Sequence, residues 1–250
     1  MAARLAGRLS YTFTMCGRYR LVRKKEILAA AFDAGDDLDW APRYNLAPGQ
    51  DVPVVRQDAQ APVRSLSLMR WGLIPSWSKD PKVGYKMINA RAETLADKPA
   101  FREPLQSSRC LIPADGFYEW AKADKSKSPY CFTLADDSVF AFAGLWDHCK
   151  NANGEPLRTC SIVTTWANPL VAGTHDRMPV ILDPENYELW LDPGFRNTDA
   201  LLELLKPYNA ESMRGWRVSA RVNSVQNDDA ECIAEYHPEP PPIEAQISLF

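Results

Sequence analysis

Short runs of branched and aromatic residues, separated by turn residues, recur along this 250-residue chain and constrain its fold most. Such runs are typical of β-strands. Strands are predicted over 16–22, 52–56, 65–73, 109–120 (as strand, turn, strand), 130–134, 139–145, 159–165 and 216–225. Helices are predicted over 24–32, 184–190 and 198–206. Because the two kinds do not alternate as in βαβ units, we expect an α+β fold with a mainly antiparallel, barrel-like β-sheet and peripheral helices.

The domain organisation follows from the same reading. No internal repeat and no interior linker stands out, so residues 15–236 are expected to form one domain. From 237 to 250 the chain is rich in proline and acidic residues, which predicts a disordered tail. Segments 130–134 and 139–145 are expected to form a hairpin that turns at Asp136 and Asp137. Thr198 is the expected N-cap of the last helix.

Composition excludes several classes of protein. Hydrophobic residues make up 46% and charged residues 24%, as in an ordinary soluble globular protein. No apolar run reaches the roughly 20 residues of a membrane span, so no membrane partner is expected. The six cysteines form no CxxC pair and there are only three histidines, which argues against a metal site. We expect no cofactor, and a monomer in a reducing cytoplasmic compartment, nucleoid-associated in a bacterium.

The net charge of −3 hides an asymmetry between the two parts of the chain. Residues 1–109 hold 18 Lys and Arg against 11 Asp and Glu, whereas residues 110–250 hold 11 against 21. Such a distribution is consistent with a local anion-binding face. It is equally consistent with a fold that interleaves the two parts, so that their charges average out.

Met15 and Cys16 resemble a translation start that lies downstream of the first methionine. Removal of Met15 would leave Cys16 with a free α-amine, whose pKa is about 7.7–8.0. The amine of such a residue condenses with an aldehyde to an imine, and the thiol then closes a thiazolidine ring. Residues 1–14 are therefore either a wrongly assigned start or a leader that must be removed. They contain no continuous apolar segment of a secretory signal.

Three more motifs contain side chains suited to chemistry. Asn89, in 88–94, can donate and accept hydrogen bonds at once and could orient a nucleophile, or it could simply satisfy loop backbone. Glu119, in 116–120, stands between aromatic residues that would raise its pKa if it is buried, although strand alternation could equally turn it outward. His175, in 173–179, lies in a polar loop and could be catalytic or structural.

Taken together, these motifs resemble the SRAP family of SOS-response-associated abasic-site processing proteins (also named SOS response-associated peptidases). Segments 44–48, 70–77 and 109–113 fit the same order and spacing, and the resemblance extends from Cys16 to about Asn227. It implies that an N-terminal Cys16 captures the aldehyde of an abasic site. It also implies roles for Asn89 in holding Cys16 and the sugar, for Glu119 in proton transfer and crosslink reversal, and for His175 in opening the sugar ring.

The resemblance also implies a partner, which is single-stranded DNA that contains abasic sites and lies in a basic groove. The candidate phosphate contacts are Arg18, Arg91 and Arg177, which flank three of the catalytic positions. Trp71 and Trp77 are candidates for stacking on bases. Trp71 lies inside a predicted strand and also fits the core, whereas Trp77 lies on a loop beside lysines.

The last five residues resemble a short peptide by which bacterial proteins bind the replication sliding clamp. Gln246 would supply a polar anchor, and Leu249 and Phe250 would fill an apolar pocket. The proline-rich segment before them would hold the peptide away from the folded domain.

The hypothesis that follows is a DNA-damage protein that forms a covalent crosslink with abasic sites. The activity would combine a peptidase-like step that exposes Cys16 with crosslinking and lyase-type chemistry. One alternative is a cysteine amidohydrolase with an N-terminal nucleophile. Another is a module that binds single-stranded DNA without a covalent bond, and its affinity would survive the loss of Cys16.

Overall fold

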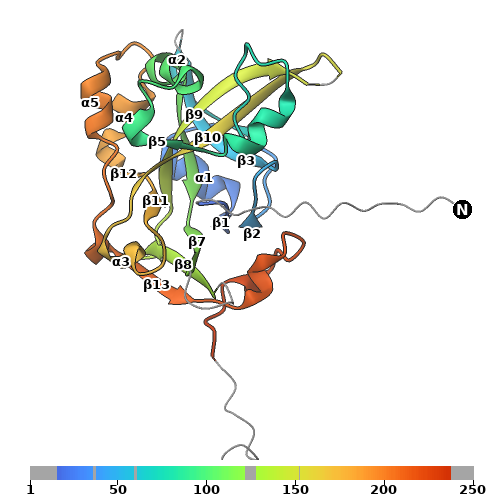
Figure 1. Ribbon diagram of the computed structural model, residues 1–250, viewed down its shortest axis with the longest axis vertical. Helices are drawn as coiled ribbons and strands as arrows, with labels where there is room; N and C mark the ends of the chain where they lie inside the picture. Colours follow the sequence, from blue (N-terminus) through green and yellow to red (C-terminus); the bar gives the residue numbers. More distant parts are fainter. Residues whose placement is uncertain (1–15, 36–37, 59–60, 122–127, 152, 238–250) are drawn as a thin grey trace, which may run out of the picture.

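In the computed structural model the strands form two sheets, over the described residues 16–35, 38–58, 61–121, 128–151 and 153–237 (Figure 1). The smaller sheet has the order β13 (Met213–Arg217), β8 (Ser128–Leu134), β7 (Gly116–Ala121), β1 (Tyr19–Leu21) and β2 (Arg43–Leu46). The larger sheet has the order β11 (Arg177–Pro179), β10 (Pro156–Trp166), β4 (Ala61–Trp71), β3 (Asp51–Asp58), β6 (Arg109–Ala114), β9 (Phe140–Lys150) and β12 (Ile181–Leu182). A short strand, β5 (Asn89–Arg91), pairs with β10.

Five strands of the larger sheet close into a barrel, because the path β10, β4, β3, β6 and β9 returns to β10 through a further pairing. Closure leaves these strands without free edges. Apart from β10 with β4 and with β5, the named strands pair in antiparallel fashion. The expected single domain with a mainly antiparallel, barrel-like sheet is therefore confirmed.

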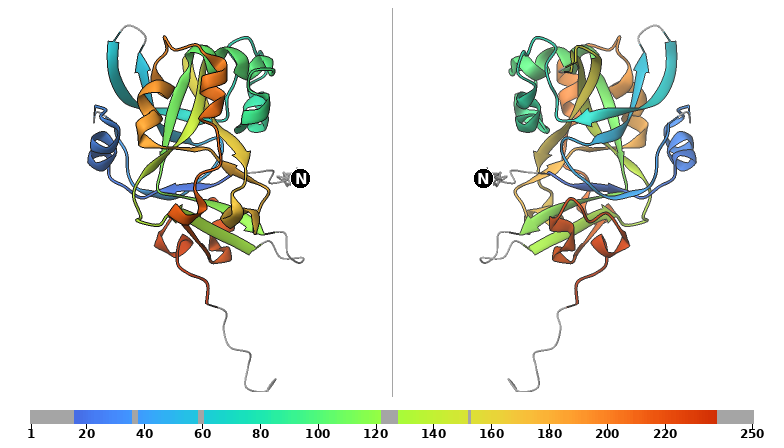
Figure 2. Two further views of the ribbon diagram at one scale, coloured as in Figure 1. Left: turned by 90° about the vertical axis from the view of Figure 1, so that its left-hand side faces the viewer. Right: turned by 90° about the vertical axis from the view of Figure 1, so that its right-hand side faces the viewer.

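Helices lie around the sheets, as expected. The α-helices are α1 (Lys25–Phe32), α2 (Pro99–Ser107), α3 (Pro169–Ala172), α4 (Tyr187–Leu191) and α5 (Thr198–Glu203). The 3-10 helices are η1 (Pro81–Lys86), η2 (Ala92–Thr94), η3 (Pro184–Asn186), η4 (Ala210–Ser212), η5 (Ala220–Asn223) and η6 (Ala230–Cys232). Figure 2 shows α2, α4 and α5 at one end of the molecule, and β7, β8 and β13 at the other.

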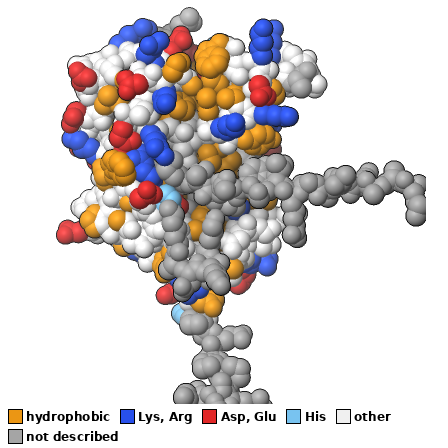
Figure 3. Space-filling view, viewed as in Figure 1, with side chains coloured by type: hydrophobic (Ala, Val, Ile, Leu, Met, Phe, Trp, Pro, Cys, Tyr) orange, Lys and Arg blue, Asp and Glu red, His pale blue; other side chains and the backbone are white. Residues whose placement is uncertain are grey.

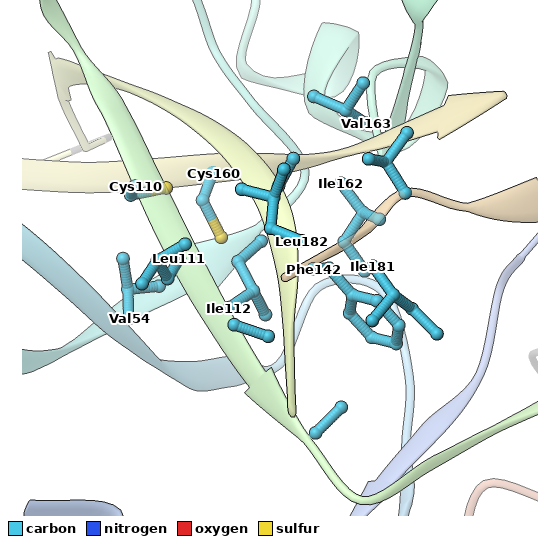
Figure 4. Packing of buried hydrophobic residues seen from close by; sticks show 14 of the residues in the cluster. Val54, Cys110, Leu111, Ile112, Phe142, Cys160, Ile162, Val163, Ile181 and Leu182 are labelled. Atoms are coloured by element: carbon cyan, nitrogen blue, oxygen red, sulfur yellow. The ribbon is translucent and has the colours of Figure 1, made fainter. Parts of the chain in front are cut away.

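One hydrophobic core joins the two sheets and the helices. Figure 4 shows Leu111, Ile112 and Phe142 among the hydrophobic side chains that pack in this core. All six residues of β6 are buried, because one face of the strand lines the barrel and the other is covered by α4. The indole of Trp190 on α4 donates a hydrogen bond to the carbonyl of Cys110 at 2.9 Å. The core thus fixes the barrel against which the functional loops rest.

The strand pairings interleave the basic and acidic parts of the sequence. β10 pairs with β4 and β5, and β7 pairs with β1, so each sheet combines elements from both sides of residue 109. The charge asymmetry along the sequence is consequently not an asymmetry between two bodies in space.

The predicted hairpin between 130–134 and 139–145 is wrong. β8 pairs with β7 and β13 in the smaller sheet, whereas β9 pairs with β6, β10 and β12 in the larger one. The turn at Asp137, whose φ is 57°, therefore carries the chain from one sheet to the other. Phe140 and Phe142 bury themselves in the core of the barrel, and this burial separates β9 from β8.

Several element boundaries also differ from the sequence-based expectations. Asn197, and not Thr198, caps α5, because its side chain accepts a hydrogen bond from the Ala200 amide at 3.2 Å. The strand expected over 216–225 ends at Arg217, since the Ser219 side chain starts η5. Helix α2, strand β2 and the 3-10 helix η1 were not predicted.

Gly72 provides a test of the packing between β4 and η1. Its φ is 128°, and a Cβ placed there would lie 2.8 Å from the Gly84 carbonyl oxygen. We expect Gly72→Ala to lower the free energy of unfolding by about 1–3 kcal/mol, the usual cost of such backbone strain. Gly35→Ala is the control, because no atom lies within 4 Å of its Cβ position. Urea denaturation of both variants measures the difference, and equal stabilities would contradict this packing.

Candidate active site

The pairing of β1 with β7 places Cys16 beside Glu119. The Tyr118 amide donates to the Arg18 carbonyl at 3.0 Å, which aligns the start of the described chain with the end of β7. The backbone nitrogen of Cys16 donates a hydrogen bond to Oε1 of Glu119 at 2.8 Å. Cys16 is buried, with 2% of its surface exposed. In the chain that includes Met15, this nitrogen is a peptide amide at the position that an α-amine would occupy after cleavage.

Glu119 is buried with its carboxylate in the site, and only 3% of the residue is exposed. The sequence left open whether Glu119 points inward or outward, and in the structure it points inward. Burial raises the pKa of the Glu119 carboxyl, while His175 and the hydrogen bond from Cys16 oppose that rise. A carboxyl with a raised pKa holds its proton at a higher pH than an ordinary carboxyl does, which suits a group that transfers protons.

Asn89 approaches Cys16 from the other sheet. It is the first residue of β5, which runs parallel to β10 and is aligned by the pairing of Asn89 with Ile162. Its side-chain nitrogen donates to the Cys16 carbonyl at 3.4 Å. Two side chains that lie far apart in the sequence therefore hold the backbone of Cys16 on both sides of its Cα atom.

His175 lies in the loop between α3 and β11. Its amide donates to the Val171 carbonyl at 2.9 Å, which continues the last turn of α3. Its Nδ1 accepts a hydrogen bond from the Arg177 amide at 3.1 Å, so the neutral ring carries its proton on Nε2. Nδ1 also lies 3.0 Å from Oδ1 of Asp176. The two backbone hydrogen bonds fix the position of the imidazole beside the site.

Arg177 and Glu93 connect the His175 loop to the Asn89 strand. The guanidinium of Arg177 binds both carboxylate oxygens of Glu93, at 2.7 and 2.9 Å, and the Thr164 carbonyl at 2.7 Å. Arg177 is 3% exposed, and paired contacts of this kind fix geometry strongly. Glu93 follows Asn89 by four residues, and Arg177 follows His175 by two. The ion pair therefore fixes the positions of Asn89 and His175 relative to each other.

The thiol of Cys16 is protonated in this environment. Burial raises the pKa of the thiol, and the carboxylate of Glu119 raises it further, against a smaller opposite effect of Arg177. The site thus contains a protonated thiol, a backbone nitrogen, a carboxyl and an imidazole close together. This set suits chemistry that starts at the nitrogen, with the sulfur reacting second.

Three of the five residues proposed as DNA contacts are buried in the structure, and Trp71 is one that also fitted the core. Arg18 and Arg177 are buried and bind protein groups; Arg18 donates to Asn45 Oδ1 at 2.8 Å and to the Val222 carbonyl at 2.7 Å. Trp71 is 1% exposed, and its indole donates to the Ile88 carbonyl at 2.8 Å. These side chains stabilise the fold and cannot stack on bases or reach phosphates as they stand.

Arg91 and Trp77 remain available for contact with a ligand. Arg91 is exposed at the end of β5, and Trp77 is 63% exposed. The segment between them adds exposed basic residues, which are Lys79, Lys82 and Lys86. Figure 3 shows Lys and Arg side chains over the upper part of the face drawn there, interspersed with hydrophobic and acidic ones.

Glu93 and Trp166 also matter for the geometry, although the sequence gives no clear signal of either. Glu93 lies inside the 88–94 motif, but its partner Arg177 comes from a distant segment. Trp166 ends β10 next to the His175 loop and is 59% exposed. A single aromatic residue at the end of a buried strand gives no signal of its own.

Within the described ranges, no three His, Cys, Asp or Glu side chains lie together in a way that could hold a metal ion. No helix in the same ranges is long and apolar enough to cross a membrane.

Comparison with known proteins identifies the family. A family model described as SOS response associated peptidase (SRAP) matches residues 15–225. The chain belongs to the SRAP family. The abasic site processing protein YoqW of Bacillus subtilis (strain 168) is 46% identical over 226 residues, which cover 89% of this chain and 100% of that protein. The abasic site processing protein HMCES of Gallus gallus is 38% identical over 224 residues, 78% of this chain and 66% of that protein.

Solved structures share the fold of this SRAP chain. A crystal structure of a protein from Bacteroides thetaiotaomicron superposes with a TM-score of 0.81 at 27% identity, over 89% of this chain and 100% of that one. A protein from Bordetella bronchiseptica gives a TM-score of 0.70 at 28% identity, over 82% of this chain and 100% of that one.

The raised pKa of Glu119 predicts how stability depends on pH. The folded state holds this proton more tightly than the unfolded chain, so stability falls as the pH rises from the ordinary value of 4.5 through the raised value. We expect Glu119→Gln, which stays neutral, to unfold at a higher temperature than the parent protein at pH 7. The gain should disappear below pH 4.5.

Glu203→Gln is the matched control. Glu203 lies on the exposed end of α5, where Lys206 lowers its pKa, so this substitution should give no gain at pH 7. Thermal unfolding of the three proteins between pH 4 and pH 8 makes the comparison. A Glu119→Gln variant that is less stable than the parent at neutral pH would show that Glu119 is held as a well-paired carboxylate.

Proposed function

We propose that this protein captures abasic sites in single-stranded DNA through Cys16, as a covalent thiazolidine. The observation that supports the proposal most is the 2.8 Å hydrogen bond between the Cys16 nitrogen and Glu119, with Asn89 on the Cys16 carbonyl. It presents the one nitrogen that becomes an α-amine when the chain begins at Cys16. Relatives that carry the name abasic site processing protein support the choice of electrophile, the aldehyde of the ring-opened sugar.

The reaction proceeds in two steps that suit the site. The α-amine of Cys16 adds to C1′ of the aldehyde, and loss of water gives an imine. The sulfur then bonds to the same carbon, and the thiol proton goes to the nitrogen. Glu119 would take a proton from the attacking amine and supply one to the departing hydroxyl, because it already binds the Cys16 nitrogen at 2.8 Å and its pKa is raised. The same proton transfers in reverse would release the DNA.

Asn89 and His175 have supporting roles in this proposal. Asn89 holds the Cys16 backbone so that nitrogen and sulfur face the same carbon, and it can also bind oxygen atoms of the sugar. His175 carries its proton on Nε2 in the neutral form and would transfer protons to and from the sugar oxygens as the ring opens. Arg91 and Trp77, with the exposed lysines between them, would hold the strand through phosphate contacts and base stacking.

Exposure of Cys16 precedes capture in this account. If translation begins at Met15, removal of that methionine suffices. If residues 1–14 are made, the bond before Cys16 must be hydrolysed. Glu119, which binds the Cys16 nitrogen, and its electrostatic neighbour His175 are the candidate proton-transfer groups. This peptidase-like step would act on the protein's own chain only.

Substitutions at Cys16 test the chemistry. With protein that begins at residue 16, we expect an intact mass equal to protein plus abasic oligonucleotide minus one water. Cys16→Ala should give no stable adduct, because it removes the thiol. Cys16→Ser keeps the amine, so an imine can form, but a stable thiazolidine cannot close. Its adduct should be lost on heating unless it is reduced with borohydride.

Cys149→Ser is the matched control, since Cys149 is the partly exposed thiol on β9. It should crosslink like the parent protein. A heat-stable adduct of Cys16→Ser would contradict ring closure. An amidase activity without any adduct would favour a cysteine amidohydrolase, and DNA affinity that survives Cys16→Ala without an adduct in the parent would favour a simple binding module.

The C-terminal peptide is proposed to bind the replication sliding clamp. Gln246, Leu249 and Phe250 lie outside the described residues, so the proposal rests on the sequence alone. Deletion of 246–250 should abolish binding to the clamp in a titration and leave crosslinking to a free oligonucleotide unchanged. Equal clamp affinity with and without these residues would refute it.

A further inference from the structure

A pocket of about 430 Å³ opens beside His175. It is lined by Trp166, Ala167, Ala172, Thr174, His175 and Asp176. Because His175 lines this pocket and is an electrostatic neighbour of Glu119, the pocket lies beside the proposed reaction site.

Trp166 is both exposed and held in place. It pairs with Arg177 across β10 and β11, and the Arg177 guanidinium lies 4.9 Å from the centroid of its ring. Arg177 is itself fixed by Glu93 and by the Thr164 carbonyl. Yet 59% of Trp166 remains exposed, while Trp71 and Trp190 are buried. An aromatic ring that is fixed before binding loses little conformational freedom when a ligand covers it.

We propose that Trp166 is a stacking platform for the nucleobase next to the abasic site. The inference rests on the proposed function, because capture of the sugar at Cys16 places the neighbouring nucleotide near His175. The abasic nucleotide has no base of its own, so the adjacent base supplies the flat surface that the indole can cover. Stacking on an aromatic side chain does not depend on sequence, which suits a protein that must act at any lesion.

The charges around the pocket favour a base over a phosphate as its occupant. Asp176 lines the pocket, and 68% of its side chain is exposed. Its carboxylate would repel a phosphate but can accept hydrogen bonds from the amino group of adenine, cytosine or guanine. Arg177, which contacts the Trp166 ring, already pairs with Glu93 and is therefore not available to bind a phosphate of the DNA backbone.

The test uses oligonucleotides that cannot crosslink, so that it does not depend on the chemistry at Cys16. A central tetrahydrofuran spacer replaces the abasic sugar and is flanked by adenines, by thymines or by further spacers without bases. For the parent protein we expect the tightest binding with adenine, then thymine, and roughly tenfold weaker binding with baseless flanks. Fluorescence anisotropy at constant salt measures the three dissociation constants.

Trp166→Ala should bind all three oligonucleotides with the affinity that the parent has for the baseless one. Trp166→Phe should retain part of the difference, because a smaller ring still stacks. Trp146→Ala is the matched control, since Trp146 also lies beneath an arginine, Arg56, with 5.5 Å between guanidinium and ring centroid. It pairs with Cys160, six residues before Trp166 on β10, and hence about 20 Å away. Its preference for flanking bases should equal that of the parent.

A Trp166→Ala variant that keeps the full difference between adenine and baseless flanks would overturn the platform. So would a parent protein that binds all three oligonucleotides equally. A separate incubation with a true abasic oligonucleotide tests the proposed function. A base preference without any adduct would support Trp166 as a platform and refute capture by Cys16, whereas an adduct without a base preference would do the opposite.

Discussion

The hydrogen bond from the Cys16 nitrogen to Glu119 is the contact on which the candidate site depends. It joins residues 103 positions apart in the sequence and lies in the protein interior. The barrel, the antiparallel pairing of β1 with β7 and the parallel approach of β5 all converge on it. Since a buried carboxylate is costly, Glu119 would be a liability in a purely structural role, and its position is best understood from the nitrogen that it binds.

Two buried carboxylates, those of Asp115 and Glu119, have different partners. Asp115 faces Arg20 and Arg23 and also accepts a hydrogen bond from the Val22 amide, so its charge is structural. Glu119 instead faces the Cys16 nitrogen and has the imidazole of His175 as an electrostatic neighbour. The arginines of the catalytic motifs hold the surrounding protein in place, since Arg177 binds Glu93 and Arg18 binds Asn45. These ion pairs and hydrogen bonds thus fix the positions of Cys16, Glu119 and His175.

Much of the fold could be predicted from the sequence, because most β-strands have a characteristic local composition. The closed barrel and helix α1 followed from such patterns, but the change of sheet at Asp137 did not. The sequence of a turn is the same whether the next strand pairs with the previous one or joins another sheet. Here the burial of Phe140 and Phe142 places β9 in the larger sheet. For the site, motif order placed Asn89, Glu119 and His175 in one group, yet it could not tell a buried arginine from an exposed one. The burial of Arg18 and Arg177 could not be predicted, because their partners come from distant segments.

The central claim is that one carbon of the abasic sugar ends up bonded to both the nitrogen and the sulfur of Cys16. An NMR spectrum of the complex made with ¹³C at C1′ of the abasic site tests it most directly. The account predicts a saturated C1′ with couplings to the Cys16 α-proton through nitrogen and to its β-protons through sulfur. An imine carbon, or an unreacted sugar in a tightly bound complex, would contradict it.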